Sequence, residues 1–361
     1  MGTPIGGNLL SRRDIGTDDP RVHVRPGKGS RPRTKKRPSF AHAEPGMVVA
    51  VDRGRFTVAI GENRMVQAVK ARALGRKGVI VGDRVGVEGD TSGTPDTLAR
   101  IVTLGDRQTV LRRSFDESEA GAREKLIVAN ATQMLIVVAA RDPEPKRGMI
   151  DRAIVAALDA KVTPLLAVTK TDLDSAQELI ADYEAIGITV FALNRDLYEP
   201  AVPELLLAET NPQTSPPDPV APGLVALQKQ LTCEITVLLG HSGVGKSTLV
   251  NALVPGANRA TGTVNEVTGK GRHTSTSAVA LPVGAQGWLI DTPGVRSFGL
   301  AHVDAAGLLR GFSELYAIAR DCPRGCTHTA DSPDCLLDEH PELALRLASF
   351  RSLLTEIPSA Y

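Results

Sequence analysis

A glycine-rich loop between an apolar run and a predicted helix constrains the fold of this chain more than any other feature. The loop reads G-x-x-x-x-G-K-[ST], and its glycines let successive backbone N–H groups wrap a phosphate chain. The apolar run 234–239 predicts a buried strand before the loop, and a helix is predicted to begin at Lys246, where its N-terminal dipole favours anions. Lys246 is expected to reach the β- and γ-phosphates, and the Ser247 hydroxyl to ligate Mg²⁺. The loop residues are Gly240, His241, Ser242, Gly243, Val244, Gly245, Lys246, Ser247 and Thr248.

Two later segments are expected to complete a site for Mg²⁺ and a triphosphate. Asp291 follows the strand-like run 287–290, where its carboxylate can hold Mg²⁺ through water, and the Gly294 N–H can meet a γ-phosphate. Thr274 lies in the polar stretch 269–277 and can ligate Mg²⁺ only while the γ-phosphate is bound, which is the physical basis of a switch loop. The alternative for that stretch is a Ser/Thr-rich loop that is merely solvated.

A guanine-recognition element is expected after the predicted strand 162–168, in place of the common N-K-x-D. Asp172 supplies a carboxylate for the guanine N1 and N2 donors, and the stem of Lys170 can cover the base. Thr169 replaces the Asn, and its hydroxyl is too short to span the same hydrogen bonds, so weaker guanine discrimination is predicted. The backbone N–H for guanine O6 is placed near Ala192. An ATP-using P-loop kinase is the competing interpretation, which the position of Asp172 disfavours.

The order of these motifs is itself informative. The base-reading element precedes the phosphate loop, which precedes both switches, whereas in the familiar G-protein order the base-reading element comes last. Joining the usual termini and cutting elsewhere gives this order without changing the sheet, because domain termini commonly lie close together. The sequence therefore predicts a circularly permuted domain whose second switch leads straight into the C-terminal region.

At 361 residues the chain exceeds the length at which one hydrophobic core stops growing, so a multi-domain protein is expected. Short β-branched runs separated by Gly- and Asp-containing turns predict a small all-β barrel of the OB type at 45–113. Apolar runs alternating with helical spacing predict a central α/β domain at 114–300, with a Pro-rich insertion at about 200–222. The phosphate loop and the guanine-recognition element indicate that this domain is a P-loop GTPase domain. A mostly helical, zinc-binding domain is predicted at 301–361.

Charge is distributed unevenly along the chain. Residues 1–44 hold ten Lys/Arg and four Asp/Glu, net +6, whereas the rest has a net charge of −5. Because this segment is also rich in Pro and Gly, it is predicted to be a disordered basic arm, serving either as a tether to polyphosphate or as a solvated tail. Phe56 is the only aromatic residue between 46 and 113, so a barrel that touches RNA is expected to recognise phosphates and shape.

Three of the four cysteines surround one histidine between two predicted helices, 303–320 and 341–356. Three thiolates and one imidazole satisfy tetrahedral zinc, and a site with four protein ligands is structural. The predicted ligands are Cys322, Cys326, His328 and Cys335. A disulfide and reduced free thiols are the alternatives. Zinc is expected to stabilise a region that is too small to form its own hydrophobic core. The fourth cysteine, Cys233, is interpreted as a buried small hydrophobe.

The longest uninterrupted apolar run, 134–140, has seven residues, far fewer than the roughly 20 needed to cross a bilayer. No membrane contact is therefore expected. With so few cysteines, a reducing cytoplasm is the default location. Nothing in the sequence resembles a coiled coil, and a monomer is the default state.

The barrel, the permuted motifs and the Cys/His cluster together resemble the ribosome small subunit-dependent GTPase A family, from about Gly46 to Ile357. Further family-like segments are Val81–Val85, Leu111–Arg113 and Gly271–Thr274. The resemblance implies a slow GTPase that is stimulated by the small ribosomal subunit, binds 16S-type rRNA and acts late in subunit maturation. It also implies help in releasing another assembly factor, one structural Zn²⁺, and Mg²⁺ bound with GTP.

Val295 stands where Ras-like enzymes carry the Gln that orients the attacking water, so hydrolysis is expected to be slow without help. The resemblance points to His273, beside the Mg²⁺ ligand Thr274, as the catalytic group once the ribosome orders the loop. The alternative function is an rRNA-binding module whose nucleotide site is mainly structural.

Overall fold

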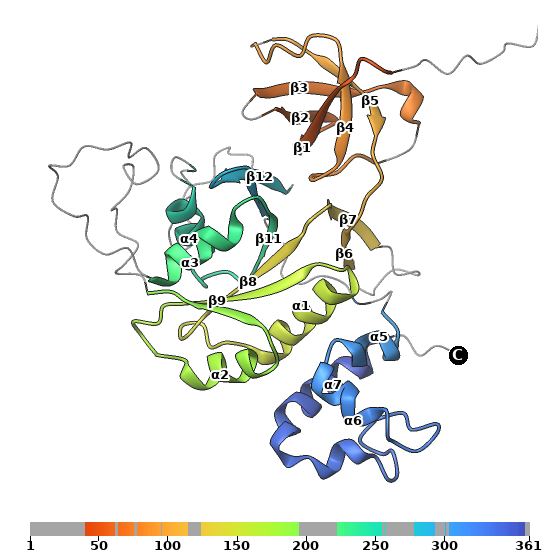
Figure 1. Cartoon of the computed structure of the whole chain (residues 1–361), viewed down its shortest axis with the longest axis vertical. Helices are drawn as coiled ribbons and strands as arrows, with labels where there is room; N and C mark the ends of the chain where they lie inside the picture. Colours follow the sequence, from red (N-terminus) through yellow and green to blue (C-terminus); the bar gives the residue numbers. More distant parts are fainter. Residues whose placement is uncertain are drawn as a thin grey trace, which may run out of the picture. The chain divides into compact units, whose positions relative to one another are not determined.

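The computed structural model describes residues 40–61, 64–75, 78–94, 96–114, 124–194, 222–254, 257, 278–292, 300 and 303–357. All of them belong to one compact unit, Phe40–Tyr361 (Figure 1). The predicted arm therefore lies outside the described residues except for 40–44, and the Pro-rich insertion lies outside them except for Pro222.

Five strands close into the expected barrel. They follow the order β1-β2-β3-β5-β4, and β4 also pairs with β1, which completes the closure (Figure 1). Alternate side chains point inward along each strand, so that Val48, Val58 and Ile101 are fully buried in a core of the barrel's own. The strands are β1 Glu44–Asp52, β2 Arg55–Ile60, β3 Arg64–Lys70, β4 Arg84–Glu88 and β5 Ala99–Leu104.

A six-stranded α/β layer carries the predicted nucleotide motifs. Its strand order is β10-β9-β8-β11-β13-β12, all parallel except β12, and it joins the barrel through the Ala50–Val279 pair of β1 and β12. The carboxyl ends of the parallel strands therefore meet at one edge, where an α/β sheet binds its ligands. The strands are β8 Gln133–Ala139, β9 Thr163–Thr169, β10 Thr189–Ala192, β11 Ile235–Leu239, β12 Val279–Val283 and β13 Gly287–Asp291.

Helices cover both faces of this layer, which explains why β8 is buried over its whole length. Even-numbered β8 residues join the core that contains α1 and α2, and odd-numbered residues join the core that contains α3 and α4. The helix α3 was not predicted, because the run of prolines ending at Pro222 masks its start, where proline fits the first helical turn. The helices are α1 Arg147–Asp159, α2 Gln177–Ala185, α3 Pro222–Leu231 and α4 Lys246–Leu253.

The family-like turn at Gly82 and Asp83 fastens the barrel to the ribbon of β6 (Val110–Ser114) and β7 (Glu124–Ala129). Gly82 has φ +88°, and an added Cβ would lie 1.9 Å from the Ala129 carbonyl oxygen, so only glycine fits. The fully buried Asp83 carboxylate accepts from Arg107 Nε at 2.7 Å and from Nη2 at 2.8 Å. The turn therefore attaches the barrel to the β6–β7 ribbon.

The C-terminal region differs from the prediction in two ways. The single helix expected at 303–320 is two short helices, α5 and α6, because the chain breaks at Gly311, where an added Cβ would lie 2.7 Å from Val155 Cγ2 of α1. The region also has no core separate from α1, since Phe312 and Phe350 belong to the same buried cluster as Ile154. The remaining elements are α5 Ala305–Arg310, α6 Ser313–Ala319, the 3₁₀ turns η1 Arg72–Leu74, η3 Leu336–Glu339 and η4 Pro341–Leu343, and α7 Ala344–Glu356.

Across the described ranges, no helix combines the length and the hydropathy that crossing a membrane requires.

Candidate nucleotide and metal sites

The glycine loop follows β11 at the centre of the sheet edge and leads into α4. Gly240 passes so close to β8 that an added Cβ would lie 2.4 Å from the Val137 carbonyl oxygen. Gly243 and Gly245 have φ of +83° and +88°, a conformation that other residues rarely adopt. The backbone can therefore take the path that a phosphate cradle requires.

The ammonium group of Lys246 lies within this loop. It donates hydrogen bonds to the carbonyl oxygens of Gly240 at 2.5 Å and His241 at 2.6 Å. Burial lowers the pKa of Lys246, and the charge of Asp291 opposes that shift. The structure thus places one cation and one carboxylate together at the edge where a Mg²⁺–phosphate group would bind.

Asp291 reaches this position because β13 runs parallel to β11, with Asp291 opposite Leu238. The next residue, Thr292, is buried and donates its hydroxyl to the Leu238 carbonyl oxygen at 3.1 Å, which holds the strand end in place. Three other predicted site residues lie outside the described residues: His273, Thr274 and Gly294.

The base-reading element meets the phosphate loop at Thr169, at the end of β9. The buried Thr169 hydroxyl lies 2.7 Å from the Val244 carbonyl oxygen and 3.1 Å from the Val138 carbonyl oxygen. The Thr169 hydroxyl reaches the loop because Gly245 lets the loop approach: an added Cβ on Gly245 would lie 3.5 Å from Thr169 Oγ1. Weaker guanine discrimination stays a prediction. Threonine ties the two motifs together with a single hydroxyl.

Lys170 and Asp172 follow in the turn after β9. Lys170 has φ +57° and donates its ammonium to the Asp142 carbonyl oxygen in the loop after β8. The Thr171 N–H donates to the Leu193 carbonyl oxygen at 3.2 Å, so the end of β10 lies beside this element. The guanine O6 contact near Ala192 stays a prediction.

The Thr169 link leads to a first testable prediction. Replacing Thr169 with valine keeps the shape but removes the hydroxyl, leaving the buried Val244 carbonyl without this partner. Because such a bond contributes about 0.5–1.5 kcal/mol, guanine nucleotide affinity is expected to fall roughly 2- to 12-fold. Isothermal titration with GDP measures the effect, and Thr169→Ser, which keeps the hydroxyl, is the control. Equal affinities for the two variants would contradict the role of this bond.

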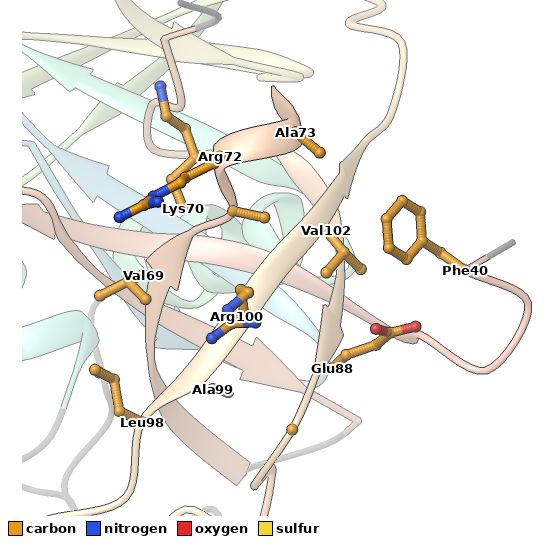
Figure 2. Close-up of a pocket in the computed structure, with 12 residues that line it drawn as sticks. Phe40, Val69, Lys70, Arg72, Ala73, Glu88, Leu98, Ala99, Arg100 and Val102 are labelled. Carbon is orange, nitrogen blue, oxygen red and sulfur yellow. The ribbon is translucent and has the colours of Figure 1, made fainter. Parts of the chain in front are cut away.

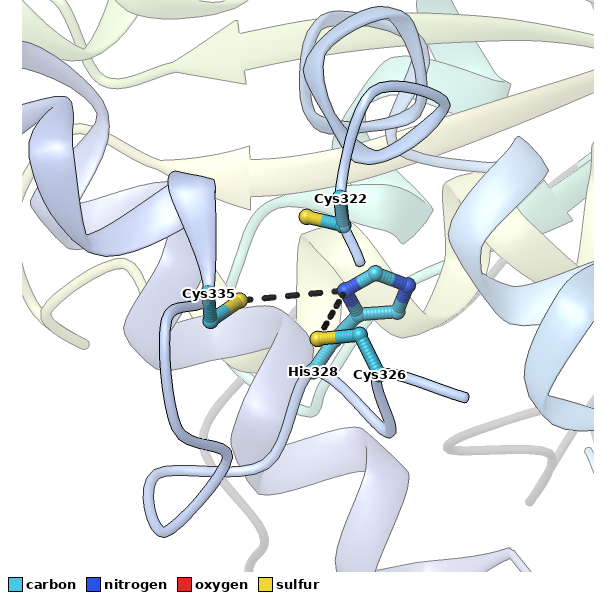
Figure 3. Close-up of side chains that lie close together, drawn as sticks. All are labelled: Cys322, Cys326, His328 and Cys335. Atoms are coloured by element: carbon cyan, nitrogen blue, oxygen red, sulfur yellow. Dashed lines mark hydrogen bonds between the residues drawn. The ribbon is translucent and has the colours of Figure 1, made fainter. Parts of the chain in front are cut away.

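The four predicted zinc ligands come together in the C-terminal region (Figure 3). Their ligand atoms all lie within 4.8 Å of one another, and His328 Nδ1 is 3.4 Å from Cys326 Sγ and 3.8 Å from Cys335 Sγ. Tetrahedral Zn–S bonds of about 2.3 Å require sulfur atoms ~3.8 Å apart, so the residues fit such an ion. Burial raises the pKa of the Cys335 thiol to about 11, and metal binding there would release a proton. The cluster could therefore hold a metal.

The remaining cysteine was predicted wrongly. Cys233 is exposed, because it sits in the turn between α3 and β11 with φ +61° and its N–H donates to the Ala285 carbonyl oxygen at 3.1 Å. All four cysteines are among the described residues, and none forms a disulfide.

A concave site lies on the barrel, and the sequence did not reveal it. A pocket of about 900 Å³ is bounded by β3, β4, β5 and η1 (Figure 2). Lys70, Arg72 and Arg100 line it together with Glu88 and the ring of Phe40. Phe40 precedes the predicted barrel, and Arg100 lies 28 residues after Arg72, so only the strand pairing brings these groups together.

Comparison with known proteins identifies the family. A family model described as RsgA GTPase matches residues 104–207 and 219–301, together more than half of the chain. The small ribosomal subunit biogenesis GTPase RsgA of Ectopseudomonas mendocina is 37% identical over 239 residues, which cover 65% of this chain and 64% of that protein. Its namesake from Pseudomonas syringae pv. syringae is 33% identical over 291 residues, 78% of this chain and 75% of the relative. The chain belongs to the RsgA GTPase family.

As an RsgA-family member, the chain is a GTP-hydrolysing enzyme. The fold agrees. The crystal structure of YjeQ from Thermotoga maritima matches with a TM-score of 0.61 at 22% identity, over 87% of this chain and 98% of that one. YloQ, described as a circularly permuted GTPase, matches with a TM-score of 0.60 at 18% identity, over 88% and 96% of the two chains. The permuted RsgA arrangement explains why Thr169 precedes Lys246 in the chain although both lie at one sheet edge.

Proposed function

We propose that this protein hydrolyses GTP on the small ribosomal subunit, assists late maturation of the subunit and helps to release another assembly factor. The observation that carries the proposal is the convergence of the phosphate loop, Asp291 and the Thr169–Asp172 element at one edge of the sheet. The names of the relatives supply the ribosomal partner.

In this proposal each motif has one task. The loop from Gly240 to Thr248 wraps the phosphates, Asp172 recognises guanine and Lys170 covers the base. The Ser247 and Thr274 hydroxyls and the Asp291 carboxylate hold Mg²⁺, which prefers hard oxygen ligands. These oxygen donors suit that ion, and the Gly294 N–H would meet the γ-phosphate.

The Cys322, Cys326, His328 and Cys335 cluster is proposed to hold one structural Zn²⁺. All four positions of a tetrahedral ion would be filled by protein, which leaves no open position for chemistry. The ion would stabilise the turns between α6 and η3 and take no part in hydrolysis.

Hydrolysis is proposed to be slow until the subunit binds. Val295 cannot orient water, so we assign that role to His273, which lies in the same segment as Thr274. A monomeric state and a cytoplasmic location also stay predictions.

The deciding experiment measures GTP hydrolysis by the purified protein with and without purified small ribosomal subunits. Stimulated turnover is expected. GTP binding without any stimulation would favour the alternative, an rRNA-binding module whose nucleotide site is mainly structural. Undetectable binding of both GDP and GTP would reject both interpretations.

The barrel is the part of the described chain best suited to face rRNA. Residues 40–113 hold twelve Lys/Arg and eight Asp/Glu, net +4, whereas residues 114–361 hold twenty and thirty, net −10. Because RNA is a polyanion, it is attracted to the first region and repelled by the second. The pocket at Arg72 and Arg100 lies on the basic side of this division.

A double substitution tests this docking surface. Arg72→Ala with Arg100→Ala is expected to weaken binding to the small subunit and to flatten the dependence of log K on log salt by about 1.4, since each lost phosphate contact removes about 0.7 for single strands. Arg55→Ala, an exposed arginine on β2 outside the pocket, is the matched control. The same slope for the double variant and wild type would exclude the pocket as an RNA contact.

A further inference from the structure

A single guanidinium group connects the C-terminal region to both helices on one face of the nucleotide domain. Arg346 of α7 donates Nη1 to the Asp151 carboxylate of α1 and Nε to Glu314 Oε1 of α6 at 2.7 Å. Its Cζ lies 4.4 Å from the centre of the Phe312 ring. Asp151 Oδ1 also accepts from the Tyr183 hydroxyl of α2 at 2.9 Å, so four helices meet at one arginine.

This cluster is buried. The Asp151 and Tyr183 residues are each 2% exposed, and the Arg346 side chain is 13% exposed. Desolvation offsets most of the attraction in a buried ion pair, so the pair contributes little net stability. It nevertheless fixes one geometry, because a misplaced partner leaves a buried charge unpaired. The cluster is therefore better suited to setting the position of helices than to adding stability.

The Arg346 cluster holds two helices of the nucleotide domain, α1 and α2. These helices carry the base side of the nucleotide site. The loop before α1 includes Asp142, whose carbonyl oxygen accepts from Lys170, and α2 begins five residues after Asp172. The two helices are also tied to each other, because Arg147 at the start of α1 forms ion pairs with Asp182 at 2.5 Å. A shift of α1 relative to α2 would thus move the groups that flank the base.

The C-terminal region reaches the opposite side of the site through the chain itself, because α5 follows β13 and Asp291 along the sequence. Arg346 provides a second connection. The C-terminal helices are thus joined to the γ-phosphate side of the site by the chain itself, and to the base side by Arg346. We propose that Arg346 is a positioning residue that couples the C-terminal region to guanine nucleotide affinity. The inference rests on the proposed roles of Lys170 and Asp172 in recognising the base.

The test is a double-mutant cycle on the full-length, metal-containing protein, with GDP affinity measured by isothermal titration. Arg346→Met and Asp151→Asn are each expected to weaken GDP binding about fivefold or more, the lower end of typical coupling between sites. The double variant is expected to bind GDP more tightly than the sum of the two single losses predicts, because both substitutions remove the shared Arg346–Asp151 contact, whose loss counts only once. Arg346→Lys should restore part of the affinity.

A second ion pair between the same helices supplies the matched control. Arg152 of α1 pairs with Glu356 at the end of α7, where the Glu356 side chain is 51% exposed. Glu356→Gln is expected to leave GDP affinity unchanged. All titrations are made well below the melting temperature of each variant, so that loss of folding does not enter.

Two outcomes would overturn the proposal. Lower melting temperatures with unchanged GDP affinity would show that Arg346 is only structural, and an equal loss in Glu356→Gln would show that any contact between α1 and α7 suffices. Neither outcome bears on the proposed function, which fails only if the wild-type protein binds no guanine nucleotide or its turnover does not respond to the small subunit.

Discussion

Removing the proposed zinc ion from the Cys322, Cys326, His328 and Cys335 cluster is expected to lower the melting temperature of the nucleotide domain as well as that of the C-terminal region. Cys335 lies in the core that also contains α1, and Cys322 and Cys326 pack against it. Structural zinc contributes apparent binding energies of about 10–16 kcal/mol in small domains. If only about 5 kcal/mol of that stabilises the nucleotide domain, its melting temperature should fall by roughly 10–20 °C, because 1 kcal/mol corresponds to about 2–4 °C for domains of about 150–250 residues.

Calorimetry before and after chelation measures this effect. Two cysteine substitutions, one inside the cluster and one outside it, provide the controls. Cys335→Ser should reproduce the loss seen on chelation, whereas Cys233→Ser, at an exposed turn outside the cluster, should melt like the wild type. The opposite result would be two separate melting transitions, of which the one that bound nucleotide stabilises keeps its melting temperature after chelation. It would show that the C-terminal region is an independent domain. That result would favour the sequence-based expectation over the shared core.

The nucleotide half of the molecule was predictable because its signals are local. The run 133–140 is apolar at every position but the first because β8 is buried on both faces, and the glycines of the phosphate loop mark a backbone path that few other residues allow. The position of Asp291 followed from the rule that ligand-binding groups gather where parallel strands end. Each of these inferences needs only the residue and its immediate neighbours.

The features that were missed depend on contacts between distant segments. Gly311 ends α5 because Val155 of α1 lies against it, and no periodicity in 303–320 reveals that neighbour. Arg346 and Asp151 are 195 positions apart, so a charged residue on the apolar face of α1 could not be assigned its partner. The pocket on the barrel arises in the same way, from a strand register that the sequence does not specify.

The second large effect is expected at the phosphate loop. Lys246→Ala removes a partly buried ammonium group whose bonds to Gly240 and His241 place it inside the loop. Because losing one partner of a buried charge pair costs about 2–5 kcal/mol, affinity for GTP is expected to fall roughly 30-fold or more. Isothermal titration measures the loss, and Lys229→Ala, at an exposed position on α3, controls for the change in net charge.

His273→Ala separates binding from chemistry when GTP affinity and GTP hydrolysis stimulated by the small subunit are both measured. A group that orients or polarises the attacking water supplies about 10²–10⁴-fold, so turnover stimulated by the small subunit is expected to fall roughly 10²-fold while GTP affinity stays at the wild-type value. Lys246→Ala should therefore lose GTP affinity, whereas His273→Ala should lose stimulated turnover. Unchanged stimulated turnover in His273→Ala would reject its catalytic role. Wild-type GTP affinity in Lys246→Ala would reject the role of the Lys246 ammonium in binding the phosphates.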